Sequence, residues 1–202
     1  IVTDPTAGTI TLDESIGENG LPETEPAGTL GQIIVDLSSS FTPAASQYGT
    51  DGEGTTVYTL NLTGDDVASG MFALNPTDPL LPGSSIVLNL VNGEIVGTSV
   101  TGGVPTEHFT ISVNPTSGEV TFTQTENVFH ANEADNDDTS SLSVGGDVLT
   151  LVQTITDADG DSVTAAADLG AGVFAIEDDG PTAAIVTDPT AGTITLDESI
   201  GE

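Results

Sequence analysis

The sequence predicts an all-β protein built as a sandwich of antiparallel sheets. Apolar and polar residues alternate in short runs such as Val57–Leu62 and Phe109–Val113, which is the period of a half-buried strand. Turn-forming residues separate the runs: Asn92-Gly93 is typical of a two-residue hairpin turn, and Asn114–Gly118 of a longer one. Valine and threonine dominate the runs, and both residues favour strands. A sandwich is the economical architecture for many short antiparallel strands.

Nine or ten strands are expected along the chain. The clearest runs are Ile33–Leu37, Val57–Leu62, Ile86–Leu90, Phe109–Val113, Val120–Thr123, Val148–Thr156 and Ser162–Leu169. Others are expected after the Asn92-Gly93 turn, just before Glu177, and at Thr193–Leu196. Evidence for helices is thin, with Ala165–Ala167 and Asp65–Leu74 as the only candidates, the second for one short turn.

The first 18 residues, Ile1–Glu18, recur without change as the last 18, Ile185–Glu202, at an offset of 184. An identical stretch of this length predicts a tandem array of nearly identical copies. We interpret residues 1–18 as a linker with a first strand, residues 19–180 as a single β-sandwich, and residues 181–202 as a linker with the start of the next copy. A division into two small sandwiches near Leu81–Gly83 is the alternative.

The chain has no lysine and no arginine against 32 aspartates and glutamates, which gives a formal net charge of −32. Nucleic acid and direct membrane contact are therefore not expected, because both need positive charge on the protein. Divalent cations are the natural complement. Ile, Val, Leu and Phe together number 53 of 202 residues, more than the roughly 20% below which a highly charged chain is usually disordered. Cysteine is absent, so no disulfide supports the fold.

The clearest chemical motif is Asp157-Ala158-Asp159-Gly160-Asp161. Alternate carboxylates on a tight turn point to one centre, and such hard oxygen ligands suit Ca²⁺. The motif is not an EF-hand, because Ser162 replaces the usual turn glycine and Asp168 is expected on a strand. We predict that Asp157, Asp159 and Asp161 bind calcium; the alternative is a hydrated acidic turn.

Further acidic groups flank the boundary between repeats. They are Asp178 and Asp179 at the end of one unit, and Asp13, Glu14 and their copies Asp197 and Glu198 at the start of a unit. Carboxylates from the end of one unit and the start of the next could share calcium ions and stiffen the junction; a hydrated hinge is the alternative. A third group, with Asp135 and Asp137, fits a calcium loop and a surface loop equally well.

An ordered series of motifs carries a family resemblance. The motifs are Thr55–Leu74, Phe109–Phe122, Val128–His130, Asp157–Asp161 and Asp178–Pro181. Together they resemble the tandem repeats of type I-secreted RTX adhesins of Gram-negative bacteria, and two of them also resemble cadherin-type modules. The resemblance implies an elaborated immunoglobulin/cadherin-like β-sandwich with calcium-binding loops, exported unfolded and folded outside the cell. The glycine-rich nonapeptide repeats of RTX proteins are not in this segment, so a β-roll is not predicted.

These observations predict a calcium-stabilised extender of a bacterial surface adhesin. Its expected partners are calcium and neighbouring copies in the same chain, and the isolated module is expected to be monomeric. Catalysis is not expected, because the chain has only two histidines, no cysteine and no nucleophile motif. We interpret His130 as a packing or loop residue, with a ligand or a base as the alternative. The alternative function is a carbohydrate- or other ligand-binding module, although aromatic residues, which sugar sites commonly use, make up only 4% of the chain.

Overall fold

We describe a computed structural model of the chain in which residues 10–14, 26–42, 47–135 and 137–180 are placed. These ranges contain twelve strands and one short 3-10 turn, η1 (Ser38–Ser40). The strands are β1 (Ile10–Asp13), β2 (Gly31–Asp36), β3 (Thr55–Leu62), β4 (Val67–Leu74), β5 (Pro82–Val91), β6 (Glu94–Thr101), β7 (Val104–Val113), β8 (Glu119–Gln124), β9 (Thr139–Ser143), β10 (Leu149–Thr156), β11 (Ser162–Asp168) and β12 (Ala171–Glu177). Within the same ranges, no helix has the length and apolar character needed to cross a membrane.

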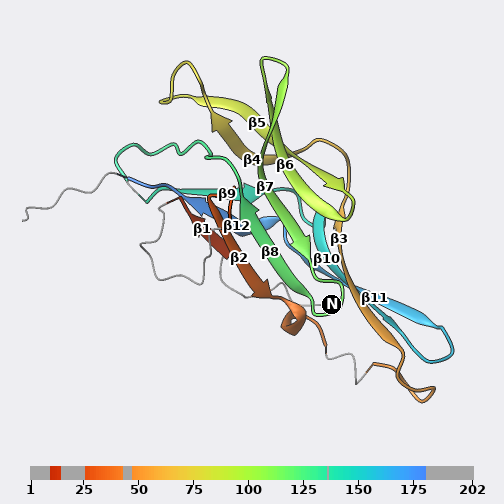
Figure 1. Cartoon of the computed structure of the whole chain (residues 1–202). Coiled ribbons are helices and arrows are strands. Elements are labelled where there is room, and N and C mark those ends of the chain that lie inside the picture. The colour runs from red at the N-terminus through yellow and green to blue at the C-terminus, as the bar shows by residue number, and fades with distance from the viewer. Residues whose placement is uncertain (1–9, 15–25, 43–46, 136, 181–202) are drawn as a thin grey trace, which may run out of the picture.

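The strands form one large sheet and two small ones (Figure 1). The large sheet has the order β2-β8-β7-β6-β5-β4, and the small sheets have the orders β1-β12-β9 and β11-β10-β3. At the two edges of the large sheet, β2 contacts β1 and β4 contacts β9, so the sheet of β12 closes over it. All the pairings are antiparallel except that of β1 with β12, which is parallel. The predicted all-β sandwich is confirmed.

One cluster of buried apolar side chains receives residues from all twelve strands. At its centre, Phe122 of β8 contacts Phe109 of β7 and Phe174 of β12, with ring centroids 5.6 and 5.2 Å apart. Phe122 therefore joins the large sheet to the small sheet that covers it. Gly97 of β6 makes room for this packing, because a Cβ at this position would lie 2.5 Å from the ring of Phe109.

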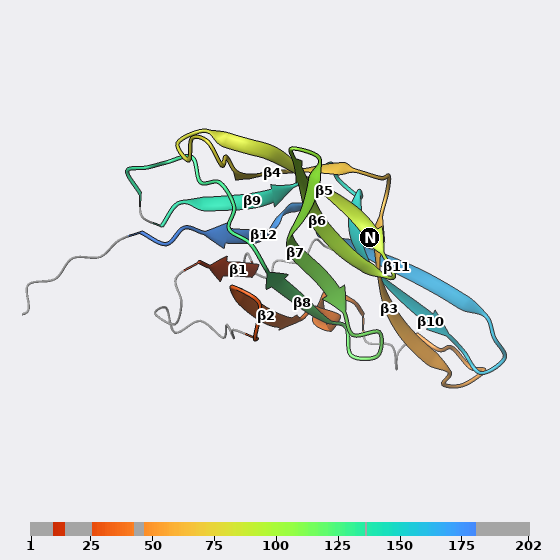
Figure 2. The ribbon, with the colours of Figure 1, turned by 45° about the horizontal axis from the view of Figure 1, so that its top comes forward.

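The third sheet projects from this body as an arm. In Figures 1 and 2, β3, β10 and β11 extend beyond the large sheet and end in the turn between β10 and β11. Near the body, Leu149 and Leu151 of β10 are fully buried, whereas the outer half of β11 is exposed. The side-chain amide of Gln153 donates a hydrogen bond to the Tyr58 hydroxyl at 2.9 Å, which ties β10 to β3 across the arm. The arm thus carries the Asp157–Asp161 turn away from the core.

The two predicted hairpins are present, and the two helix candidates are wrong. Asn92 and Gly93 have φ angles of 53° and 91°, and this left-handed pair closes the β5–β6 hairpin. The segment Asn114–Gly118 connects β7 to β8. Ala165–Ala167 lies in β11, and Asp65–Leu74 forms a bend followed by β4, because pairing with neighbouring strands overrides weak helical preference.

Two strands lie outside the ten that the sequence predicts, namely β4 and β9. Strand β9 reads Thr-Ser-Ser-Leu-Ser, and only Leu142 is buried, so its sequence carries almost no apolar alternation. The first strand, expected from its copy at Thr193–Leu196, is β1, and its Ile10 and Leu12 are buried in the common core. The copy itself lies outside the described residues. The alternative division near Leu81–Gly83 falls where β5 begins, inside the large sheet.

Replacing Phe122 by alanine should lower the free energy of unfolding by about 3–5 kcal/mol, because the change leaves a cavity between the two sheets. Ile34→Ala on the neighbouring strand β2 is the matched control, because Ile34 is 54% exposed. Urea unfolding followed by circular dichroism measures both losses. Equal losses in the two variants would contradict the assigned core.

Candidate metal sites

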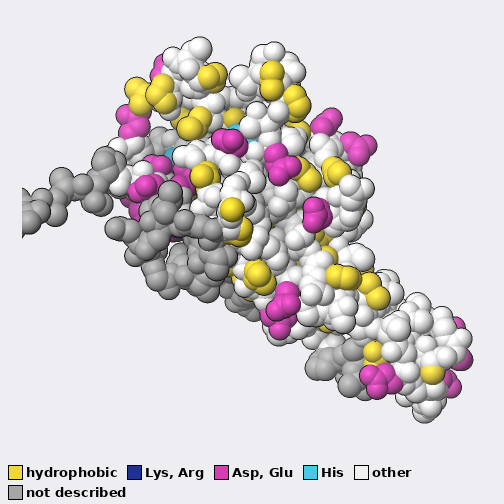
Figure 3. All heavy atoms as spheres, in the orientation of Figure 1, with side chains coloured by type: hydrophobic (Ala, Val, Ile, Leu, Met, Phe, Trp, Pro, Cys, Tyr) yellow, Lys and Arg dark blue, Asp and Glu magenta, His cyan; other side chains and the backbone are white. Residues whose placement is uncertain are grey.

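Among the described residues, three groups of acidic and histidine side chains bring one potential ligand atom each to within 4.8 Å of one another. The hairpin cluster consists of Asp51, Asp157 and Asp159. The sheet-end cluster consists of Asp13, Asp137 and Glu177. The histidine cluster consists of Glu14, His130 and Asp178. Figure 3 shows carboxylates spread over one face of the molecule and at the tip of the arm.

The hairpin cluster is built on the turn between β10 and β11. One carboxylate oxygen of Asp157 accepts the N–H groups of Gly160 and Asp161 at 3.1 and 2.9 Å, which fixes the turn. A hydrogen bond between the carboxyl groups of Asp157 and Asp159 lowers the pKa of Asp157 and raises the pKa of Asp159. One carboxylate oxygen of each of these residues and of Asp51 lies within 4.8 Å of the others, and a divalent cation bound among them would offset the repulsion between their charges.

Asp51 joins this cluster from the segment before β3. Strand β3 pairs with β10 so that Thr55 lies opposite Thr156, and this register brings the preceding loop against the turn. This loop passes so close to the end of β10 that position 54 must be glycine, because a Cβ there would collide with the carbonyl oxygen of Thr156. The carboxylate of Asp51 and those of Asp157 and Asp159 all offer oxygen ligands, which is the ligand chemistry of Ca²⁺.

The sheet-end cluster lies where β1 and β12 end. Asp13 and Glu177 are direct partners in the parallel pairing of these strands, and Asp137 reaches them from the loop before β9. Asp13 is buried, with 3% exposure. Burial raises the pKa of Glu177, and the negative charges of Asp137 and then Asp13 add to this effect. The three carboxylates run from the buried Asp13 to the exposed Asp137, and they offer only oxygen ligands, which suit a hard cation.

The histidine cluster lies one residue further along the same two strands. Because successive side chains of a strand alternate in direction, Glu14 and Asp178 diverge from Asp13 and Glu177 and gather around His130. One carboxylate oxygen of Glu14 accepts hydrogen bonds from the Gln124 side chain at 2.6 Å and the Val128 N–H at 3.0 Å. Burial lowers the pKa of His130, but Glu14 and then Asp178 raise it more, so the net direction is upward.

The structure brings together some of the eleven acidic residues that the sequence nominates. Six of them lie in the three clusters: Asp13, Glu14, Asp137, Asp157, Asp159 and Asp178. Three others, Asp135, Asp161 and Asp179, belong to none of these clusters. Asp135 instead accepts the N–H of Asp137 and shapes its own loop. Asp197 and Glu198 lie outside the described residues.

Sequence reasoning missed Asp51 and did not select two other members of the clusters as ligands. Glu177 belongs to the acidic run that follows the last predicted strand, and a ligand role for His130 was only the alternative. An Asp-Gly-Glu-Gly segment before a strand was the available signal for Asp51. The predicted sharing of calcium between two units involves residues outside the described ranges. The described residues show a different pairing, in which the start and the end of the same unit meet because β1 runs beside β12.

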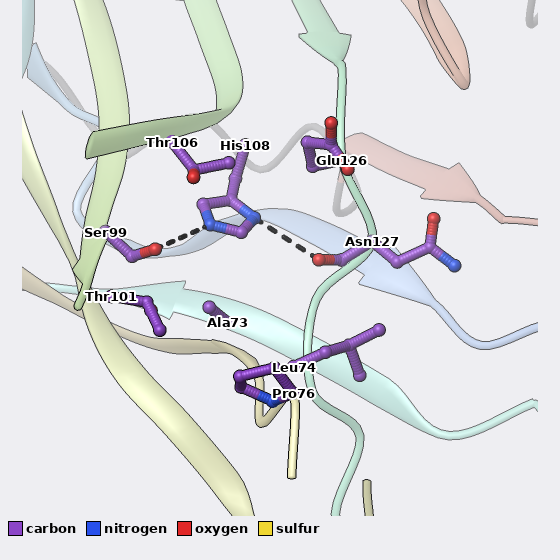
Figure 4. A pocket seen from close by; sticks show the side chains of 9 residues that line it. All are labelled: Ala73, Leu74, Pro76, Ser99, Thr101, Thr106, His108, Glu126 and Asn127. Carbon is purple, nitrogen blue, oxygen red and sulfur yellow. Dashed lines mark hydrogen bonds between the residues drawn. The ribbon is translucent and has the colours of Figure 1, made fainter. Parts of the chain in front are cut away.

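A separate cavity of about 300 Å³ lies beside His108 of β7 (Figure 4). His108 is 4% exposed, and its ring bridges the Ser99 hydroxyl at 2.9 Å and the Asn127 carbonyl at 3.2 Å. Because a carbonyl oxygen only accepts hydrogen bonds, Nδ1 donates to Asn127, and in the neutral ring Nε2 accepts from Ser99. Burial lowers the pKa of His108 despite the opposing effects of Asn127 and Glu126. Among the described residues that line the cavity there is no Phe, Tyr or Trp.

A protein-family model described as a domain of unknown function, DUF5801, matches residues 4–170. The chain belongs to the DUF5801 family. No curated protein and no solved structure matches it. The matched DUF5801 segment contains the whole hairpin cluster but ends before β12, so Glu177 and Asp178 lie just beyond it.

His108 should make this DUF5801 domain lose stability on acidification. Its pKa in the folded state is below the ordinary value near 6.5, so the unfolded state binds the proton more readily. Its contribution is therefore present above about pH 6.5 and lost as the pH falls, by up to about 1.4 kcal/mol per pH unit.

The test compares wild type with His108→Gln. The difference between the two proteins cancels the titration of the ionisable groups that both contain. The free energy of unfolding of wild type should fall relative to that of His108→Gln as the pH is lowered from about 7.5 to about 5.5. Urea unfolding at each pH measures it, and a difference independent of pH would contradict the prediction.

Proposed function

We propose that this chain is a calcium-stabilised extender module of a large bacterial surface adhesin, repeated in tandem so that a distal binding domain projects from the cell. Its role is structural rather than catalytic. Its partners are neighbouring copies in the same chain and calcium ions. The resemblance to type I-secreted RTX adhesins supports an extracellular location, where calcium is plentiful.

The observation that carries the proposal is the parallel pairing of the first and last described strands. Both β1 and β12 point the same way (Figure 2). The chain therefore enters the sheet at one end and leaves it at the opposite end. Copies joined in series would continue in one direction, whereas an antiparallel pair would return the chain to its starting side. This geometry favours linear extension.

The repeated 18 residues support the same function. Strand β1 completes the core through Ile10 and Leu12, and its sequence recurs unchanged at positions 194–197. A following unit would thus begin with the same core strand after 184 residues. Identical units suit a spacer, because every unit then has the same length and the same mechanical response.

Calcium is the proposed stabilising ion because the chain cannot neutralise its own charge. The hairpin cluster and the sheet-end cluster offer oxygen ligands only, from Asp51, Asp157 and Asp159 and from Asp13, Asp137 and Glu177. An ion that binds only the folded state stabilises it by about 2.7 kcal/mol per site at a hundredfold excess over its Kd. Two such sites represent a large share of the ~5–15 kcal/mol that separates folded from unfolded domains.

The second candidate function is ligand binding by the same adhesin, for example of a carbohydrate. The cavity beside His108 is where such a ligand would bind. Its described lining contains no Phe, Tyr or Trp on which a sugar ring could stack, and His108 is already engaged on both ring nitrogens. The extender function is therefore favoured.

Small-angle scattering on a chain of two consecutive units tests the proposal. With calcium, the maximum dimension should be about twice that of one unit, because units that continue in one direction add their lengths. With a chelator, the distribution of dimensions should broaden as the ion-dependent parts loosen.

The single unit measured under the same two conditions is the control. Two outcomes would contradict the extender function. One is a calcium-bound pair no longer than a single unit, which would mean that the units fold back on each other. The other is a distribution that is the same with calcium and with chelator.

A further inference from the structure

We propose that the histidine cluster of Glu14, His130 and Asp178 binds a divalent transition-metal ion of the Zn²⁺ class rather than calcium. This site is distinct in chemistry from the two clusters of carboxylates. The proposal does not rest on the extender function.

The state of the His130 side chain is the first observation. The side chain is 6% exposed, and the remaining exposure of the residue lies on its backbone. In the described part of the chain, neither Nδ1 nor Nε2 makes a hydrogen bond of good geometry, although Glu14 and the backbone of Asp138 lie near the ring. Buried polar side chains almost always have partners, and one without any indicates an absent ligand or a strained position.

The position of Glu14 is the second observation. Its side chain is 4% exposed, and one oxygen is fixed by Gln124 and Val128. The other oxygen, Oε2, lies 3.9 Å from Nε2 of His130, which is too far for a hydrogen bond. Two ligands at about 2.1 Å from a tetrahedral zinc ion lie about 3.4 Å apart, so a bound ion would draw Oε2 and Nε2 together by about half an ångström. The spacing is thus compatible with two ligands that share an ion.

Asp178 supplies the third ligand atom. It directly follows β12, and its N–H donates to the carbonyl of Asp138 at 3.0 Å, which holds the backbone beside the cluster. All three side chains line one cavity of about 250 Å³, which Glu133 also lines. Three protein ligands with space for water at a fourth position describe the open form of a zinc site.

The ligand set decides between the two classes of ion. Calcium takes six to eight oxygen ligands, and an imidazole nitrogen is not among its usual donors. Imidazole suits zinc, copper, nickel and iron, and carboxylates complete such sites. In the described part of the chain, the histidine cluster is the one cluster of the three that contains a nitrogen donor. The competing account is a buried ion pair of His130 and Glu14 without any metal.

The test is a calorimetric titration of the whole chain with Zn²⁺ in the presence of excess calcium, which competes with zinc for any site that contains only carboxylates. We expect one zinc ion to bind and calcium to fail to displace it. His130→Gln should weaken zinc binding by about tenfold or more, because it removes the nitrogen ligand. The matched control is His108→Gln, which removes the only other histidine, and Asp159→Asn controls for the hairpin cluster; both should bind zinc like wild type.

Three results would overturn the proposal: no zinc binding by wild type, displacement of zinc by calcium, or equal zinc affinity in His130→Gln. If His130→Gln does not fold, NMR signals of the histidine ring nitrogens in the wild-type protein show directly whether zinc binds at His130. Zinc should shift the ¹⁵N signals of His130 and leave those of His108 in place. Unshifted His130 signals would mean that the cluster is an ion pair only.

Discussion

The structure depends on one constraint, which is the mutual repulsion of 32 carboxylates in a chain that has no lysine or arginine to offset it. In an ordinary domain, basic side chains offset the repulsion between acidic groups. Here the only side chains that can become cationic are His108 and His130, and burial lowers the pKa of His108 and so favours its neutral form. Buried carboxylates such as Asp13 and Glu14 therefore need either hydrogen bonds or a bound cation. The fold gathers carboxylates around a few points, where a bound cation would offset their charge.

The parallel pair of β1 and β12 connects the core, the ion clusters and the direction of the chain. Inside the molecule, Leu12 and Phe174 belong to the core that Phe122 joins across the two sheets. At the end of the same pair, consecutive residues diverge into the sheet-end cluster and the histidine cluster. An ion bound at either cluster would therefore hold the first strand against the last. Since these strands carry the chain in at one end and out at the other, ion binding, stability and extension would change together.

The sequence contains enough local information to predict the fold class, because strands, hairpins and the Asp157–Asp161 turn depend on neighbouring residues. Strands β4 and β9 could not be predicted with the same ease. Gly70 has a φ of 84° within β4, and β9 has one buried apolar residue, so both strands are defined by their neighbours. The clusters depend even more on distant contacts. Glu14, His130 and Asp178 are far apart in the chain and meet only because β1, β12 and the segment after β8 converge, and Asp51 reaches its cluster through the register of β3 with β10.

The central claim is that specific cation binding, rather than general screening of charge, stabilises this fold. Its most direct test is the thermal unfolding of the chain in increasing calcium chloride, compared with sodium chloride and magnesium chloride at matched ionic strength. Specific binding predicts a melting temperature that rises steeply and progressively with calcium, as mass action requires, and rises much less with sodium or magnesium. An equal rise in all three salts, or no rise in any of them, would contradict the claim and leave the acidic clusters as hydrated surface.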